Sequence, residues 1–247
     1  MYKKDDSFVF SPSDLTTFLN SPFASWMDHY ASVSPDTAPE KDADDSLSVS
    51  LQKKGYEHEG AIKLDMIKQG MSVADLSDVD DKFQETINAM NQGRDVIFQA
   101  FLQKSPFQGY SDFLVKVQGG SHLGDYHYEV WDTKLAKNTK PYFLIQLCCY
   151  TDMLQEIQGV RPEYLTVVLG NSEKDRFRTE DYFYYYQALK KSFLEMHNDF
   201  DISKQPDPAD FASWGCWETY AKRLLEDKDH LSQVATLKRS QVKKLTK

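Results

Sequence analysis

The sequence predicts an α/β fold in which a mixed β-sheet is flanked by α-helices. Three observations support this prediction. Helical segments dominate the first third of the chain, three strand-like segments then follow one another through residues 95–135, and a helix separates them from the continuous apolar run Tyr164–Leu169. An apolar run without alternation is typical of a strand that is buried on both faces. Helices, consecutive strands and a buried strand in this order indicate one sheet covered by helices.

The predicted helices are marked by capping residues and by the glycines that end them. The segment Ser11–Leu15 (SPSDL) indicates a helix start, with Ser11 or Ser13 as the cap. Gly70 ends the second helix, and residues 32–48, rich in Ser, Asp, Pro and Ala, predict a loop before it. The predicted helices cover about residues 11–30, 49–69, 80–92, 141–158, 184–199 and 215–228.

The predicted strands are short segments bounded by turn residues. Gly119-Gly120-Ser121 and Gly124-Asp125 supply the turn between the two central strands. The predicted strands are residues 73–76, 95–103, 107–118, 126–135, 164–169 and, at the edge of the sheet, 177–183.

The composition is that of a globular chain. The 247 residues, of which 40% are hydrophobic, are enough for one large domain or two small ones. No apolar run approaches the roughly 18 residues that a membrane span requires, and the start of the chain lacks the apolar stretch of a signal peptide. The three cysteines, Cys148, Cys149 and Cys216, show no spacing typical of a secreted disulfide framework. We therefore expect a cytoplasmic protein.

The net charge of −9 restricts how this protein can meet nucleic acid. A protein that coats nucleic acid non-specifically depends on many phosphate contacts, so the charge argues against that class. A nuclease is compatible with this charge, because it needs only a local basic lining and its metal-binding carboxylates add negative charge.

Two predicted strands contain an aspartate in otherwise apolar surroundings. Asp112 lies in GYSDF, and Asp132 lies in VWDTK together with Lys134. Aspartate is depleted in strands, and a buried carboxylate has to be paired or has to hold a metal. Neighbouring antiparallel strands lie about 5 Å apart, so the two carboxylates can converge on one ion. Residues two apart on a strand share a face, which places Asp132 and Lys134 together.

This arrangement is the one that metal-assisted phosphodiester hydrolysis requires. Oxygen ligands hold Mg²⁺ or Mn²⁺, which polarises the phosphate and lowers the pKa of a bound water. A lysine beside the ion can position that water and stabilise the developing charge. The alternative is that Asp112 and Asp132 are exposed on an edge and that Lys134 is their solvated partner. The two aspartates, together with the D-x-K spacing of Asp132 and Lys134, favour a catalytic metal site over exposed side chains.

Five segments together resemble the RecB-like branch of the PD-(D/E)XK nucleases, and the resemblance covers most of the chain. Their order and spacing match the family's N-terminal helix, early helix motif, second motif, (D/E)-x-K motif and Q-x-x-x-Y motif. The five are Ser11–Leu15 with Ser21-Pro22, Gly55–Glu59 (GYEHE), Gly109 with Asp112, Asp132-Thr133-Lys134, and Gln146–Tyr150 (QLCCY). The resemblance implies a restriction-endonuclease-like core.

The resemblance also implies a role for each matching residue. Asp112 and Asp132 would be metal ligands and Lys134 the catalytic lysine. His58 would add a ligand, with Glu59 and then Glu57 as the neighbouring alternatives. Gln146 and Tyr150 would bind or orient the nucleic-acid backbone; four residues apart on a helix, they share a face, which is also the pattern of a simple packing surface.

The chain departs from the family at its cysteines. CRISPR-associated RecB-like exonucleases carry four cysteines that hold an iron–sulfur cluster, one of them in a Cys-Pro pair near the N-terminus. Here that pair is Ser21-Pro22, and the C-terminal region keeps Cys216 alone. Serine does not replace a thiolate in such a cluster. We therefore predict no iron–sulfur cluster, and packing by Trp214, Trp217 and Tyr220 in its place.

Two regions are predicted along the chain: a nuclease domain at residues 1–228 and a basic C-terminal tail at 229–247. The tail resembles the start of a segment that follows the nuclease domain in a larger RecB-like family. It is interpreted as the start of a truncated following domain, as a basic extension that contacts nucleic acid, or as a solvated amphipathic helix.

The function predicted from these patterns is a divalent-metal-dependent deoxyribonuclease that acts on ends or single strands. Two alternatives are a non-catalytic nucleic-acid-binding module with the same fold and an unrelated interaction domain. The expected partner is nucleic acid, which the resemblance implies is DNA, and no membrane is expected. Lysines are expected to line the cleft, and the acidic segments 36–45 and 75–81 to lie away from it. The lysines are Lys116, Lys134, Lys137 and Lys140.

Overall fold

The computed structural model describes residues 1–5, 7–43, 45–237 and 239–245, and its centre is a six-stranded sheet. The strands follow one another across the sheet in chain order. The outer pair β3/β4 and the pair β6/β7 are parallel, and the other neighbours are antiparallel. The strands are β3 (Val73–Asp75), β4 (Val96–Lys104), β5 (Phe107–Ser121), β6 (Gly124–Thr133), β7 (Tyr164–Val168) and β8 (Lys174–Arg178). The predicted α/β class with a mixed sheet is confirmed.

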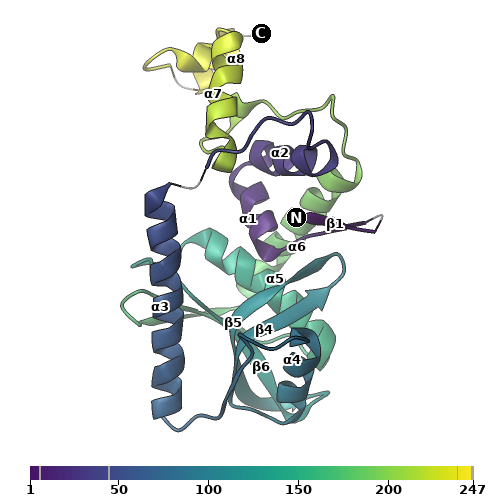
Figure 1. Cartoon of the computed structure of the whole chain (residues 1–247), viewed down its shortest axis with the longest axis vertical. Helices are drawn as coiled ribbons and strands as arrows, with labels where there is room; N and C mark the ends of the chain where they lie inside the picture. Colours follow the sequence, from purple (N-terminus) through teal and green to yellow (C-terminus); the bar gives the residue numbers. More distant parts are fainter. Residues whose placement is uncertain (6, 44, 238, 246–247) are drawn as a thin grey trace.

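Helices cover both faces of this sheet (Figure 1). They are α1 (Pro12–Asn20), α2 (Pro22–Val33), α3 (Ser46–Lys68), α4 (Lys82–Asn91), α5 (Pro141–Gln158), α6 (Glu180–Asn198), α7 (Glu218–Asp227) and α8 (Arg239–Leu245). Short 3-10 turns lie at Pro208–Asp210 (η1), Gly215–Trp217 (η2) and Leu231–Gln233 (η3).

The two faces of the sheet bury different cores. On one face, α4 and α5 pack against inward residues such as Leu114, Val130 and Leu165. On the opposite face, α3 contributes Ile62 and Met66 to a smaller core. Asp112 and Asp132 alternate with the residues of that smaller core along their strands, so their side chains start from the α5 face.

A third core joins the two ends of the chain away from the sheet. Phe23 and Met27 of α2 pack there with Trp217 and Ala221. Trp214 and Tyr220 are packed against the same cluster, as the sequence predicted. The tail lies beside it, because Val242 of α8 is buried and lines a hollow together with residues of the η1 and α7 region.

Several predicted boundaries are corrected. The helix expected over residues 11–30 is two helices, because Ser21 caps the end of α1 and its side chain accepts a hydrogen bond from the Ala24 amide at the start of α2. The edge strand expected over 177–183 lies at Lys174–Arg178, and α6 begins at Glu180. The strands β1 (Tyr2–Lys4) and β2 (Ser7–Val9) form a small hairpin that the sequence analysis did not predict.

Candidate active site

Asp112 and Asp132 face each other where β5 and β6 separate. The ladder between the two strands ends at the pair Phe113–Trp131, and the two aspartates occupy the next positions. Beyond that point the Asp112 side chain takes the place of a strand partner. Its Oδ2 atom accepts hydrogen bonds from the Thr133 amide at 2.7 Å and the Thr133 hydroxyl at 2.9 Å. The predicted juxtaposition of the two strands is therefore present.

Lys134 is fixed beside these carboxylates. Its Nζ atom lies 2.5 Å from Asp132 Oδ2. Its backbone amide donates to the Val168 carbonyl of β7 at 2.8 Å, which holds the end of β6 in the sheet. Burial lowers the pKa of Lys134, but Asp132 and Asp112 outweigh it, so the pKa stays above its ordinary value and the side chain is an ammonium.

The carboxylates themselves lie in an unfavourable environment for negative charge. Asp132 is only 2% exposed. Burial raises the pKa of both aspartates; Lys134 opposes this effect in each case, and Asp112 raises the pKa of Asp132 further. Buried like charges at one point are relieved by a cation, which makes this cluster the candidate active site.

Glu59 brings a third carboxylate from α3, on the other side of the sheet. Burial and then the charges of Asp112 and Asp132 raise the pKa of Glu59 to about 7. The side-chain amide of Gln99 donates to Glu59 Oε2 at 2.9 Å. Among the neighbouring alternatives of the early helix motif, Glu59 thus faces the aspartates, whereas Glu57 is exposed.

Gln99 is a residue of the site that the sequence analysis did not single out. It stands opposite Asp112 between the ladder pairs Phe98–Phe113 and Ala100–Ser111, and its φ is +56°. Left-handed backbone is unfavourable for a non-glycine residue and is typical of functional sites. The available signal was an amide inside the otherwise apolar strand VIFQAF.

His58 is also close to the cluster, since a positive charge on it lowers the pKa of Asp112. Its Nε2 atom is buried and has no hydrogen-bond partner within the described residues. An unpartnered imidazole nitrogen beside carboxylate oxygens fits a site for Mg²⁺ or Mn²⁺. As the side chains stand, no group of three or more His, Cys, Asp or Glu residues in the described part of the chain is arranged around one point as a metal site. Asp112 Oδ2 is directed to Thr133 and Asp132 Oδ2 to Lys134.

Gln146 and Tyr150 of α5 approach the same cluster from the face of the sheet that α5 covers. Tyr150 is hydrogen-bonded to Gln146, and both aspartates raise the pKa of its hydroxyl, after the larger effect of burial. Gly109 permits this approach, because a Cβ there would lie 2.9 Å from Pro12 Cδ and 3.2 Å from Tyr150 Cε1. Tyr150 is only 5% exposed, so its surroundings favour a role in orienting the site; backbone binding by Gln146 and Tyr150 stays a prediction.

The lysines that were expected to line the cleft lie in two different places. Lys137 and Lys140 are exposed in the connection between Lys134 and α5, and their role in lining the cleft stays a prediction. Lys116 was wrongly placed: its Nζ atom donates to the Gly93 carbonyl at 2.6 Å and pairs with Asp95 at 2.8 Å. That contact lies toward the opposite end of β5 from Asp112.

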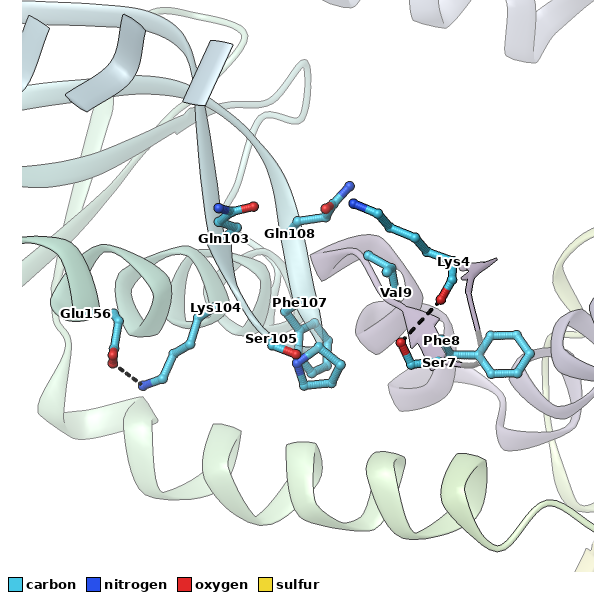
Figure 2. Close-up of a pocket in the computed structure, with 11 residues that line it drawn as sticks. Lys4, Ser7, Phe8, Val9, Gln103, Lys104, Ser105, Phe107, Gln108 and Glu156 are labelled. Carbon is cyan, nitrogen blue, oxygen red and sulfur yellow. Dashed lines mark hydrogen bonds and ion pairs between the residues drawn. The ribbon is translucent and has the colours of Figure 1, made fainter. Parts of the chain in front are cut away.

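Two hollows flank the strands of the site. The first, about 320 Å³, is lined by Glu59 and Gln99, and Ser77 also lines it. Ser77 belongs to the acidic segment 75–81, and the expectation that this segment lies away from the cleft stays a prediction. The second, about 430 Å³, lies between the β1–β2 hairpin and the β4–β5 turn (Figure 2). Its lining contains Lys4, Lys104 and Glu156 but none of the carboxylates of the candidate active site.

The cysteines lie in two separate places. Cys148 and Cys149 are buried in α5, where burial raises the pKa of each thiol to about 12. Cys216 lies in η2, with its Sγ atom 4.0 Å from Asp28 Oδ1. The prediction that no iron–sulfur cluster is bound stays a prediction. In the described residues, no helix is long and apolar enough to cross a membrane.

Comparison with known proteins adds no family to this description. No model of a known protein family matches the sequence, and no curated protein matches it.

Proposed function

We propose that this protein is a divalent-metal-dependent nuclease with a restriction-endonuclease-like core of the RecB-like type, and that it hydrolyses phosphodiester bonds of DNA. The observation that carries the proposal is the cluster of three acidic side chains from three elements around one lysine. Glu59, Asp112 and Asp132 interact electrostatically with one another and with Lys134. A purely structural sheet has no use for buried carboxylates that repel one another.

Asp112 and Asp132 would hold Mg²⁺ or Mn²⁺, with His58 and Glu59 as further donors. A bound ion of this kind polarises a phosphate and lowers the pKa of a water. Gln99 fixes the orientation of Glu59, and Thr133 fixes that of Asp112. Such preorganised donors favour catalysis because little rearrangement is needed when the substrate binds.

Lys134 would act on the substrate. Its ammonium group can donate a hydrogen bond to the phosphate oxygens, where negative charge develops during hydrolysis. The exposed Lys137 and Lys140 lie a few residues further along and would contact neighbouring phosphates. Tyr150 and Gln146 would support the aspartates from the α5 side.

A nuclease assay tests the proposal. Labelled single-stranded and double-stranded DNA and RNA are incubated with the protein and Mg²⁺, Mn²⁺ or EDTA. We expect cleavage with either metal and none with EDTA. Lys134→Ala should abolish it, and Lys191→Ala, which removes an exposed lysine of α6, should cleave like the wild type.

Two results would contradict the proposal. Cleavage that persists in EDTA, or that is equal in Lys134→Ala and wild type, would show that the activity does not come from this site. Binding of nucleic acid without any cleavage would instead favour the alternative, a non-catalytic nucleic-acid-binding module.

A further inference from the structure

The hollow beside Glu59 adjoins the candidate active site directly. Its volume of about 320 Å³ is at the small end of the range for ligand pockets. Glu59 and Gln99 line it, and both belong to the candidate active site. Its walls come from α3, β4 and the segment that leads into α4. The lining residues are Tyr56, Glu59, Gly60, Lys63, Ser77, Lys82, Phe98 and Gln99.

The hollow offers flat aromatic surface. Tyr56 is 70% exposed at its wall, an unusual position for a large aromatic side chain next to buried carboxylates. Phe98 lies at the same hollow as part of the smaller core, with Lys63 Nζ 4.6 Å from its ring centroid. Exposed aromatic rings at a groove are the groups on which the bases of single-stranded nucleic acid stack.

Positive charge is held on two walls of the hollow. Lys63, from α3, forms an ion pair with Asp75 at 2.6 Å, which a substrate phosphate would share. Lys82, from α4, donates to the Ser77 carbonyl at 2.7 Å and lies 5.0 Å from the ring centroid of Tyr110. Two ammonium groups near an exposed aromatic ring suit an anionic ligand with a flat ring.

We propose that this hollow is a subsite for one unpaired nucleotide of the substrate, next to the phosphodiester bond that the candidate active site would cut. The base stacks on Tyr56, and flanking phosphates face Lys63 and Lys82. The inference rests on the proposed function and names the residues that would select an unpaired nucleotide. A base that is paired within a duplex is stacked on both sides and has to leave the helix before it can enter a pocket.

Binding to an inactive protein tests the subsite without cleavage. A fluorescent single strand of about ten thymidines and a hairpin duplex are titrated into Lys134→Ala in EDTA, and fluorescence anisotropy is measured. Adding Tyr56→Ala should weaken single-strand binding by about tenfold or more, the loss expected for one stacked base. Tyr56→Phe should bind like the parent, because stacking needs the ring and not the hydroxyl. Tyr184→Ala, which removes a 77% exposed tyrosine of α6, is the matched control.

A second measurement tests whether the base stacks on Tyr56. A strand with 2-aminopurine should lose fluorescence on binding, because stacking quenches this base, and the loss should disappear in Tyr56→Ala. Circular dichroism and thermal unfolding establish that each variant is folded. Equal affinity and equal quenching in Tyr56→Ala and Tyr184→Ala, or stronger binding of the duplex than of the single strand, would overturn the subsite.

Failure of the subsite and failure of the proposed function give different results. Wild-type protein that cleaves DNA while Tyr56→Ala binds and cleaves equally well leaves the function standing and removes the subsite. Tyr56-dependent binding of single strands without cleavage by the wild type supports the subsite and removes the nuclease. Absence of binding to either DNA contradicts the subsite.

Discussion

The carboxylate of Asp132 is buried and pairs with the ammonium group of Lys134. Metal binding should distinguish the role of Asp132 from that of Lys134. Replacing Lys134 by alanine removes this ion pair and frees Asp132 Oδ2 for a cation. We expect Lys134→Ala to bind Mn²⁺ at least as tightly as the wild type in calorimetry, and Asp132→Ala to lose binding. Equal loss in both variants would show that Lys134 organises the ligands.

Gly109 gives a second prediction at the scale of one residue. A methyl group there would meet Pro12 and Tyr150 at 2.9 and 3.2 Å. Either α1 or Tyr150 has to move, and overpacking of this kind costs about 1–3 kcal/mol. We expect Gly109→Ala to lower the free energy of unfolding by that amount, measured by urea denaturation. Gly120→Ala is the control on the same strand, since nothing lies within 4 Å of its added Cβ. An equal effect of the two substitutions would contradict this interpretation.

At the scale of elements, α5 and α6 are joined by a charge cluster around Asp152. Its carboxylate accepts hydrogen bonds from Lys190 at 2.6 Å, Lys104 at 2.9 Å and the Tyr186 hydroxyl at 2.9 Å. Lys190 is largely buried, whereas its neighbour Lys191 is exposed and makes a 3.8 Å pair with Glu195. We expect Lys190→Ala to destabilise the protein by about 2–3 kcal/mol and Lys191→Ala by less than about 0.5 kcal/mol. Chemical denaturation of the two variants measures the difference.

A second junction of elements depends on pH. His29 of α2 and His197 of α6 share a hydrogen bond between their Nδ1 atoms at 2.8 Å, and Ser25 lies 3.0 Å from His197 Nε2. Burial lowers the pKa of His29 to about 4 and that of His197 to about 3, so the folded protein holds both rings neutral. The resulting stabilisation is complete above the ordinary histidine pKa of 6.5 and is lost as the pH falls through 4.

We therefore expect wild-type stability to fall between pH 6.5 and 4 by up to about 3 kcal/mol for each histidine. His197→Gln keeps a hydrogen-bonding side chain that does not titrate, and its stability should fall less over the same interval. His122→Gln, at an exposed turn residue, should follow the wild type. Parallel pH profiles for His197→Gln and wild type would show that the pair does not control acid stability.

The elements differ in how far they could be predicted from the sequence. The bounds of α5 match because Pro141 starts the helix and Gly159, at φ +73°, ends it, and both signals are local. β8 and α6 were misjudged because the aromatic residues of 177–183 fit a strand as well as a helix. The contact of His29 with His197 spans 168 positions, and the place of Gln99 depends on its neighbours in the sheet. Such features depend on tertiary packing; the amide inside VIFQAF marks Gln99 as unusual, but it does not give the partner of Gln99.

At the scale of the whole molecule, a net charge of −9 has to be reconciled with a polyanionic substrate. Among the described residues, a handful of lysines lies near the candidate active site, so we expect few phosphates to be neutralised. We expect the logarithm of single-strand affinity to fall against the logarithm of salt concentration with a slope of about −2 to −3, near −0.7 for each phosphate neutralised. Lys137→Ala with Lys140→Ala should weaken binding and flatten the slope. Lys222→Ala with Lys228→Ala, on and beside α7, should do neither; equal behaviour of the two double variants would place the contacts elsewhere.

The long helix α3 packs into the core mainly through its C-terminal half. Its buried side chains, Ile62 and Met66, lie in its C-terminal half, whereas Leu47 and Leu51 of its N-terminal half are exposed. His58 and Glu59 stand between the two halves. Amide protons before residue 58 should therefore exchange with deuterated solvent sooner than those after it. If Mn²⁺ slows exchange at the middle of the helix, the ion itself completes the order of the segment that binds it.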